Sequence, residues 1–390
     1  MKTRILTRVL AFLVLAQAVI AGPYADIIAP YASNNTTSGA VFLVADAQRV
    51  IACEAAGFAD IASAKPMRPD TLFWIASMTK PITAAAFMML VDEGKVALDD
   101  PVSKYIPEFA TPQKIIQKSA PQQAADGQAA EPVFRKGPVT LRHLLSHTAG
   151  FRRDGDIPFH RPYNDALPLS KIVPLYATLD IHFEPGTNYR YSSIDIATIG
   201  RVIEVVAGIP YETFLQKRIF DPLGMTETTF WPTPAQLERL ATPYRGSPKK
   251  HTLTPGIIAQ RQYPLDDRVK RHPTPGGGLF STAGDIAKFG QLLLNKGVAA
   301  NGKRLLSEAA VAEMTRRQTP PVTKEAYGLC IRIANSGRSF GHSGAYGTQL
   351  SVWPKDGKVT VFMIQKINSW GGPDGDKLRP ALDAQALLEK

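Results

Sequence analysis

The stretch that decides the fold is F-W-I-A-S-M-T-K-P-I-T-A-A-A-F-M-M-L-V-D-E-G, residues 73–94. It predicts a short apolar approach followed by a helix buried on most sides, because residues 82–91 are almost continuously apolar. Ser77 and Lys80 stand three apart at its start, a spacing that puts two side chains on one face of a helix. The first N–H groups of a helix lack backbone partners, so they favour negative charge beside the serine. Burial would favour the neutral amine of Lys80, so the two groups could serve as nucleophile and base.

The Ser-x-x-Lys pattern alone is weak evidence, because the chain contains a second copy, Ser247-Pro248-Lys249-Lys250. That copy lies in a Pro-, Gly- and Lys-rich stretch with no apolar helix behind it, and we interpret it as an exposed loop. For Ser77 taken by itself, a helix N-cap serine beside a solvated lysine is an equal alternative. The choice therefore depends on the other motifs of the chain.

The composition is that of a globular protein. The chain has 390 residues, of which 44% are hydrophobic and 20% charged, enough for one large core or two. The formal charge is +11, but the basic residues are scattered except for the cluster Arg268-Val269-Lys270-Arg271. This distribution argues against nucleic-acid binding, which would need a basic patch or a recognition motif. Cys53 and Cys330 lie in apolar, strand-like stretches, which favours two buried thiols, with a disulfide as the alternative.

Residues 1–21 are typical of an export signal peptide. Lys2, Arg4 and Arg8 form a basic start, and residues 9–20 form an apolar run too short to span a bilayer comfortably. We therefore expect a mature protein that begins near residue 22 and is periplasmic or secreted. A retained membrane anchor is the alternative, and no other stretch is long and apolar enough to cross a membrane.

Along the rest of the chain, strands come first, then helices, then strands again. This order predicts an α+β fold, in which an antiparallel sheet built from N- and C-terminal strands is flanked by helices. We expect one α/β domain from residues 22–109 and 280–390, which carries the sheet and the nucleophile helix, and an inserted, mainly helical domain at 110–279. The expected strands are a hairpin at 39–54 and runs at 327–333, 339–341, 348–353 and 358–364, and the expected helices are 140–151, 170–182, 195–208, 211–220 and 282–296.

Three other features were weighed for function. Residues 110–138 are rich in Gln, Ala, Pro and Gly, which predicts an exposed excursion, with a flap over a pocket as the alternative. His143 and His147 are four apart, but position 144 is Leu where a zinc protease needs Glu, so we reject a zinc site and expect helix-end packing. Residues 273–278, P-T-P-G-G-G, lack the glycine spacing of a dinucleotide-binding loop. No metal or cofactor is therefore expected.

Four stretches together resemble the serine β-lactamase / penicillin-recognising family. They are S-M-T-K at 77–80, L-L-S-H-T-A-G at 144–150, P-G-T-N-Y-R-Y-S-S at 185–193 and G-H-S-G at 341–344. Their order and spacing match the family pattern too, and the match extends over most of the mature chain. Joint occurrence is far more specific than any single motif, and it makes the N-cap alternative for Ser77 untenable.

The resemblance implies a role for each matched residue. Ser77 would be the acylated nucleophile, Lys80 its base partner and Tyr191 the phenol that helps to shuttle the proton. The backbone N–H groups of Ser77 and Ala345 would form the oxyanion hole. The residues expected to bind substrate are Ser193, His342, Ser343 and Gly344.

Two departures from the β-lactamase pattern bear on the substrate. Ser193 replaces an asparagine and His342 replaces a lysine, and both family residues help to hold a β-lactam. A neutral histidine is a weaker anchor for an anion. The altered pattern is similar to class C-like family VIII carboxylesterases and to D-amino-acid-type hydrolases, so we expect hydrolysis of small carboxylic esters or amides.

Three alternatives remain at this stage. The first is a β-lactamase or D-amino-acid peptidase acting on β-lactams or cell-wall peptides. The second is a non-catalytic penicillin-binding-like protein. The third is a different nucleophile, since Gly341-His342-Ser343-Gly344-Ala345 approaches the G-x-S-x-G elbow of α/β-hydrolases. Because that stretch lacks the final glycine and no acid and histidine follow it in the usual order, we expect Ser343 to line the pocket.

Overall fold

A computed structural model describes residues 22–116, 131–152, 167–247, 252–258, 264–265, 267–367 and 375–388. In these ranges seven strands form an antiparallel sheet in the order β3-β2-β1-β11-β10-β9-β8. They are β1 (Gly39–Ala45), β2 (Val50–Asp60), β3 (Lys65–Pro66), β8 (Arg332–Ile333), β9 (Phe340–Ser343), β10 (Gln349–Trp353) and β11 (Lys358–Met363). Because β1 pairs with β11, strands from both ends of the chain share one sheet. The predicted α+β class is confirmed, while residues 1–21 lie outside the described ranges.

The central strand β1 is buried along its whole length, which explains its continuous apolar sequence. Successive side chains of a strand point to opposite faces. Accordingly, Phe42 and Val44 pack in one apolar cluster with the terminal helices, and Val41 and Leu43 pack in the main core on the other face. The sheet is therefore covered on both sides.

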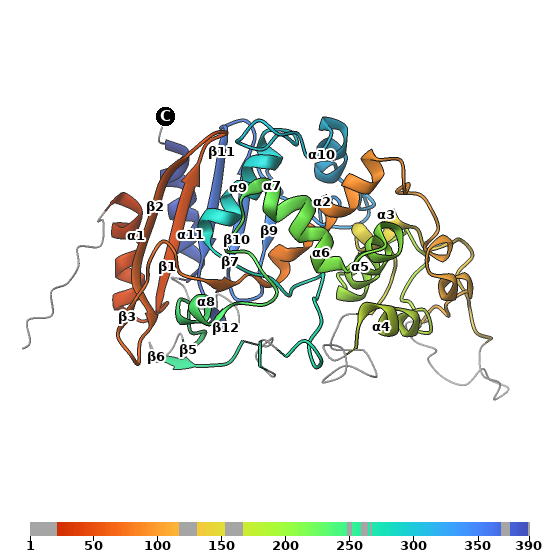
Figure 1. The fold of residues 1–390 in the computed structure, drawn as a ribbon, viewed down its shortest axis with the longest axis horizontal. Coiled ribbons are helices and arrows are strands. Elements are labelled where there is room, and N and C mark those ends of the chain that lie inside the picture. The colour runs from red at the N-terminus through yellow and green to blue at the C-terminus, as the bar shows by residue number, and fades with distance from the viewer. Residues whose placement is uncertain are drawn as a thin grey trace, which may run out of the picture.

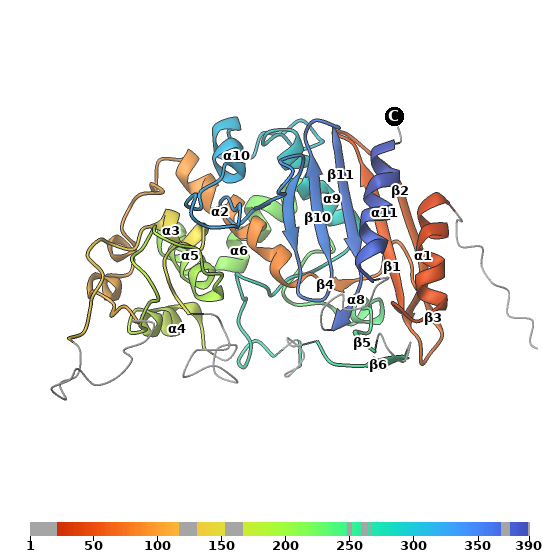
Figure 2. The ribbon, with the colours of Figure 1, turned by 180° about the vertical axis from the view of Figure 1, so that it is seen from behind.

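The helices α1 (Pro23–Ser33) and α11 (Gly375–Leu388) cover one face of the sheet, and α9 (Ala283–Leu294) covers the other. Figures 1 and 2 show α1 and α11 side by side at one end of the molecule. The strand β9, near the opposite edge of the sheet, contacts the turn that carries the motif serine and the helix that follows it.

The helix α2 (Thr79–Asp92) lies between the sheet and a group of helices, where it contacts β9, α5, α6 and α10 (Figure 1). Every residue from Thr79 to Leu90 is buried, so the expectation of a helix enclosed on most sides is confirmed. The other described helices are α3 (Leu141–Leu145), α4 (Leu169–Tyr176), α5 (Ser193–Ala207), α6 (Tyr211–Leu215) continued by a π turn (Gln216–Phe220) and α7 (Asp221–Leu223), α8 (Pro234–Glu238) and α10 (Glu308–Thr315). The boundaries 110–279 of the inserted domain stay a prediction.

Short strands and 3-10 turns complete the described fold. The strands are β4 (Phe73–Trp74) paired with β7 (Phe280–Ser281), and β5 (Tyr244–Ser247) between β6 (Thr252–Pro255) and β12 (Lys366–Ile367); the 3-10 turns are η1 (Ala76–Met78), η2 (Val102–Lys104) and η3 (Pro107–Ala110). Ser247 of the second Ser-x-x-Lys copy ends β5 and is half-buried, so its interpretation as an exposed loop residue is wrong, while 248–251 are outside the described ranges. The same is true of 117–130, most of the expected excursion.

Three expected elements are shorter than the apolar pattern suggested. The helix expected at 140–151 ends at Leu145, because His147 adopts a left-handed backbone with φ 58°. The helix expected at 170–182 ends at Tyr176, just after the internal Pro174. The strand expected at 327–333 is reduced to β8, because Cys330 has φ 55° and turns the chain. A positive φ at a residue other than glycine is not signalled by hydrophobic periodicity.

Cys330 is buried, Cys53 is half-buried and both are free thiols. The disulfide alternative is therefore wrong. Cys53 lies in β2 and Cys330 in the turn before β8, and no bond joins them. In the part of the chain that the structure describes, no helix has the length and apolar character needed to cross a bilayer.

Two glycines of α9 allow the packing of this helix on the sheet to be tested. A Cβ at Gly290 would lie 2.5 Å from Val359 Cγ1, whereas the nearest atom to a Cβ at Gly284 is Thr282 Oγ1 at 4.0 Å. We expect Gly290→Ala to lower the free energy of unfolding by about 1–3 kcal/mol through overpacking. Gly284→Ala should raise it by roughly 0.5–1 kcal/mol, because alanine loses less backbone entropy in a helix. Urea titrations of both variants would contradict the packing if Gly290→Ala proved as stable as Gly284→Ala.

Candidate active site

The 3-10 turn η1 presents Ser77 directly before α2. The backbone at Ala76, the preceding residue, has φ 46°, a region that costs free energy for any residue with a side chain. The strand pairing of β4 with β7 and the bond from Ile75 N–H to the Leu279 carbonyl, 3.0 Å, hold this approach in place. In a 3-10 turn side chains three apart eclipse one another, so Ser77 and Lys80 face each other as the spacing predicted.

Lys80 is 1% exposed and its Nζ lies 3.3 Å from Ser77 Oγ. The same nitrogen donates a 2.5 Å hydrogen bond to the carbonyl of Gly276. No carboxylate of the described residues forms an ion pair with it. The amine is therefore held by one neutral acceptor and by the hydroxyl of the motif serine, an arrangement that suits a proton acceptor.

The loop at 273–278 provides that carbonyl, a role that sequence reasoning missed. Thr83 Oγ1 donates to the Pro275 carbonyl at 2.7 Å and shares a 2.6 Å hydrogen bond with the Tyr211 hydroxyl. Trp74 Nε1 donates to the Gly277 carbonyl at 2.7 Å. A Cβ at Gly276 would lie 3.3 Å from Lys80 Nζ, so glycine lets the backbone approach the amine closely. The run of three glycines was the available signal.

The edge of the main sheet meets the serine turn at Gly344. A Cβ there would overlap the Ile75 carbonyl and Thr348 Oγ1, so only glycine permits this approach. Thr348 Oγ1 donates to the same Ile75 carbonyl at 3.2 Å, and Gly344 N–H donates to the Thr348 carbonyl at 2.7 Å. Ala345 therefore follows a residue that is fixed against the residues preceding Ser77. The oxyanion role of the two N–H groups stays a prediction.

Tyr191 lies beside Lys80. The distance from Lys80 Nζ to the centroid of the Tyr191 ring is 4.7 Å, and the guanidinium carbon of Arg332 lies 5.8 Å from the same centroid. Two basic side chains thus border one phenol ring. Among the described residues no hydrogen bond joins the Tyr191 hydroxyl to Ser77 or Lys80. Ser193, at the start of α5, also lies beside Gly276, because its Oγ is 3.5 Å from where a Cβ of Gly276 would be.

His342 is 1% exposed, and both of its ring nitrogens are engaged within the protein. Its Nδ1 lies 2.8 Å from the Ser343 carbonyl, which can only accept, so Nδ1 carries the proton. Its Nε2 lies 2.9 Å from the Tyr327 hydroxyl, which must then donate. Burial, with the charges of Lys80 and Arg332, holds the pKa of His342 well below its usual value. A neutral histidine at this position agrees with the expectation. Because its two ring nitrogens bond Tyr327 and Ser343, however, neither is left for a substrate.

His147 forms a second buried histidine pair. Its side chain and that of Asp195 are both 0% exposed, and His147 Nδ1 lies 2.7 Å from Asp195 Oδ2. The His147 ring centroid lies 4.5 Å from that of Tyr191 and 5.3 Å from that of Tyr327. Burial, followed by the charge of Lys80, keeps the pKa of His147 well below its usual value. The helix-end packing expected of this residue therefore places it directly against the predicted phenol.

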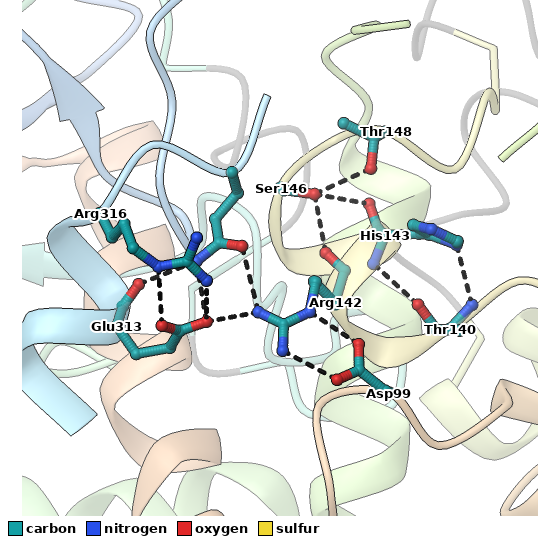
Figure 3. A network of polar contacts seen from close by, with 9 residues as sticks. Asp99, Thr140, Arg142, His143, Ser146, Thr148, Glu313 and Arg316 are labelled. Atoms are coloured by element: carbon teal, nitrogen blue, oxygen red, sulfur yellow. Dashed lines mark hydrogen bonds and ion pairs between the residues drawn. The ribbon is translucent and has the colours of Figure 1, made fainter. Parts of the chain in front are cut away.

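A polar network holds the short helix α3, which leads to His147 (Figure 3). Arg142 donates to both oxygens of Asp99, at 2.7 and 2.9 Å, and also binds Glu313 of α10. The hydrogen bonds from Arg316 and then from Arg142 lower the pKa of Glu313 to about 2, so this carboxylate stays charged at neutral pH. Ser146 Oγ lies 2.9 Å from Thr148 Oγ1 and thus links the residues on either side of His147 (Figure 3).

The two histidines of α3 do not converge on a common point. His143 Nδ1 accepts a 3.2 Å hydrogen bond from Thr140 N–H as part of a capping box, whereas His147 faces Asp195. Within the described ranges no group of three or more His, Cys, Asp or Glu side chains is placed to hold a metal ion.

Known proteins are similar to this chain in sequence and fold. The Beta-lactamase family model matches residues 24–387, so the chain belongs to the Beta-lactamase family, and the predicted resemblance is confirmed. The chain is thus a β-lactamase-fold protein of the serine hydrolase type.

Individual relatives differ in their described activities. The chain is 31% identical over 275 residues to esterase EstB of Burkholderia gladioli, covering 64% of each protein. It is 29% identical over 332 residues to a putative D-alanyl-D-alanine carboxypeptidase of Salmonella agona, covering 77% of this chain and 70% of that one. Among solved structures, EstCE1, described as a hydrolase with promiscuous acyltransferase activity, matches with a TM-score of 0.73 at 24% identity, covering 93% of this chain and 97% of that one. The last comparison shows the shared fold.

The buried histidines predict how stability depends on pH. The folded chain holds the pKa of His342 and of His147 well below about 6.5, the value in an unfolded chain. Below that pH the unfolded chain binds protons that the folded chain does not, so stability falls with falling pH, by up to about 1.4 kcal/mol per pH unit for each histidine. We expect His342→Gln to reduce the slope of unfolding free energy against pH between about pH 7 and 5 in urea titrations. An unchanged slope would contradict the assignment.

Proposed function

We propose that this protein is a serine hydrolase that cleaves small carboxylic esters through an acyl-enzyme. The observation that carries the proposal is the contact between a fully buried amine, Lys80 Nζ, and Ser77 Oγ at 3.3 Å, at the start of a buried helix. In its neutral form the amine can donate to the Gly276 carbonyl and still accept the proton of the serine hydroxyl.

The proposed reaction has two acyl-transfer steps. Ser77 Oγ attacks the ester carbonyl carbon while its proton passes to Lys80, and the carbonyl oxygen becomes an oxyanion near the N–H groups of Ser77 and Ala345. The C–O bond to the alcohol then breaks, and the proton on Lys80, relayed with the help of Tyr191, neutralises the leaving alkoxide. Water attacks the acyl-enzyme by the same route in reverse, giving the free acid and restoring Ser77. A second alcohol in place of water would give acyl transfer.

Ester cleavage is favoured over β-lactam cleavage by the two altered positions. Ser193 is shorter than the family's asparagine, and His342 is neutral and hydrogen-bonded internally, so neither offers the anchors on which a β-lactam carboxylate and amide depend. The 31% identity to esterase EstB also supports this choice. We also propose, from the sequence of residues 1–21, that the protein is exported.

A D-amino-acid peptidase acting on cell-wall peptides is the second candidate. The guanidinium of Arg332, 5.8 Å from the Tyr191 ring centroid, provides a cation that could hold a peptide carboxylate in place of the missing lysine. The 29% identity to a putative D-alanyl-D-alanine carboxypeptidase supports this candidate as well. A non-catalytic binding protein is the third, and the close contact of Ser77 with Lys80 argues against it.

Replacement of the nucleophile tests the proposal. We expect Ser77→Ala to lower kcat on p-nitrophenyl butyrate by more than about a thousand-fold, because no other group forms the acyl-enzyme. Ser247→Ala, in the second Ser-x-x-Lys copy, is the matched control and should keep wild-type activity. Retention of full esterase activity by Ser77→Ala would refute the proposal.

A substrate comparison separates the candidates. Purified protein is assayed on p-nitrophenyl esters of increasing acyl length, on nitrocefin and on a D-alanyl-D-alanine peptide. We expect kcat/KM for the short esters to exceed that for nitrocefin by at least about a hundred-fold, roughly 2.7 kcal/mol of transition-state binding. A higher kcat/KM on the peptide would replace the esterase assignment by the peptidase.

A further inference from the structure

The buried pair His147–Asp195 has no part in the reaction as described, although it lies against a predicted catalytic group. His147 is 0% exposed and Asp195 lies in the first turn of α5, four residues after Tyr191. The 2.7 Å distance between His147 Nδ1 and Asp195 Oδ2 is that of a close hydrogen bond. A carboxylate can only accept, so Nδ1 carries the proton and Asp195 fixes the orientation of the ring.

His147 also holds the backbone beside Tyr191. Its carbonyl accepts a 2.8 Å hydrogen bond from the N–H of Arg190, the residue before the tyrosine. The imidazole packs on the phenol ring, with centroids 4.5 Å apart and planes inclined by 47°. One residue thus contacts Tyr191 through its ring and the preceding residue through its backbone carbonyl.

The backbone of His147 has an uncommon conformation. Its φ of 58° is uncommon for a residue other than glycine, although histidine, asparagine and aspartate adopt it more often than most, and it persists only where the surroundings hold it. The Arg142 network fixes the turns before it, and the bond from Thr148 N–H to the His143 carbonyl, 2.8 Å, fixes the turn after it (Figure 3). The fold therefore keeps His147 in this uncommon backbone conformation at the point where the residue contacts Tyr191.

We propose that His147 and Asp195 are positioning residues that hold the Tyr191 ring against Lys80 and Ser77. This inference rests on the proposed function. Lys80 Nζ lies 4.7 Å from the centroid of the same ring, so a shift of the phenol changes its distance from the reacting amine directly. A misplacement of about 1 Å at a reacting group can cost about 100-fold in rate.

A double-mutant cycle tests this role. His147→Asn removes the imidazole but keeps a residue type that tolerates positive φ. We expect kcat on p-nitrophenyl butyrate to fall by roughly 10- to 100-fold with little change in KM, because the effect is on the reacting geometry. In a Tyr191→Phe background the same substitution should cause no further loss, since no phenol hydroxyl remains to be positioned. A merely structural role would lower kcat equally in both backgrounds.

The control is His143→Asn, which changes the same residue type on the same helix, four positions earlier. His143 caps α3 through Thr140, so this variant reports any general effect of loosening the helix. We expect His143→Asn to leave kcat unchanged relative to its parent in both the wild-type and the Tyr191→Phe background. Thermal unfolding checks each variant, and Asp195→Asn takes the place of His147→Asn in the cycle if the latter does not fold.

The outcomes separate the inference from the proposed function. Losses that multiply in the double variant, or an equal loss in His143→Asn, would overturn the positioning role. Full activity of Tyr191→Phe would overturn it too, while leaving Ser77 as the nucleophile. Full activity of Ser77→Ala would instead reject the proposed function, whatever the cycle shows.

Discussion

The site depends on one buried amine. Lys80 is enclosed by α2 and the loop at 273–278, and its Nζ is held between the Gly276 carbonyl and Ser77 Oγ. A buried amino group must find acceptors or lose free energy, so the loop, the 3-10 turn and the helix are constrained to meet around it. Thr83 and Trp74 reinforce this by binding the carbonyls on either side of Gly276. The position of the Ser77 hydroxyl therefore follows from the hydrogen bonds that the buried Lys80 amine requires.

Two parts of the fold then bring the remaining groups to the same point. The edge of the sheet contributes Gly344, which packs against the residues that precede Ser77. The helical lobe contributes Tyr191, whose ring contacts the buried His147 and lies 4.7 Å from the amine. Both contacts are rigid. At Gly344 the absence of a side chain permits backbone-to-backbone packing, and at Tyr191 a buried acid–imidazole pair supports the ring. The esterase function proposed for this family member follows from this convergence together with the loss of the two β-lactam anchors.

Much of this could be predicted from the sequence, and the reasons for the rest are physical. The order of strand-like runs predicted the shared sheet, because β1 and β11 are buried on both faces and are rich in apolar, β-branched and aromatic residues. The spacing of Ser77 and Lys80 predicted their contact, because it depends only on local helix geometry. The role of Gly276 was missed, since a backbone carbonyl leaves no chemical signature in the sequence. His147 was taken for helix-end packing, because its contacts with Asp195 and Tyr191 depend on tertiary structure that spacing does not encode. The internal bracing of His342 by Tyr327 was hidden for the same reason.

The most direct test of the central claim is the rate and site of labelling by a fluorophosphonate, followed by mass spectrometry of the digested protein. If Lys80 activates Ser77, the adduct forms on Ser77, and Lys80→Met, which places an apolar side chain of similar length in a buried site, slows labelling by at least about a hundred-fold. Labelling of Ser77 at the wild-type rate in Lys80→Met, or an adduct on Ser343 in the wild-type chain, would contradict the account.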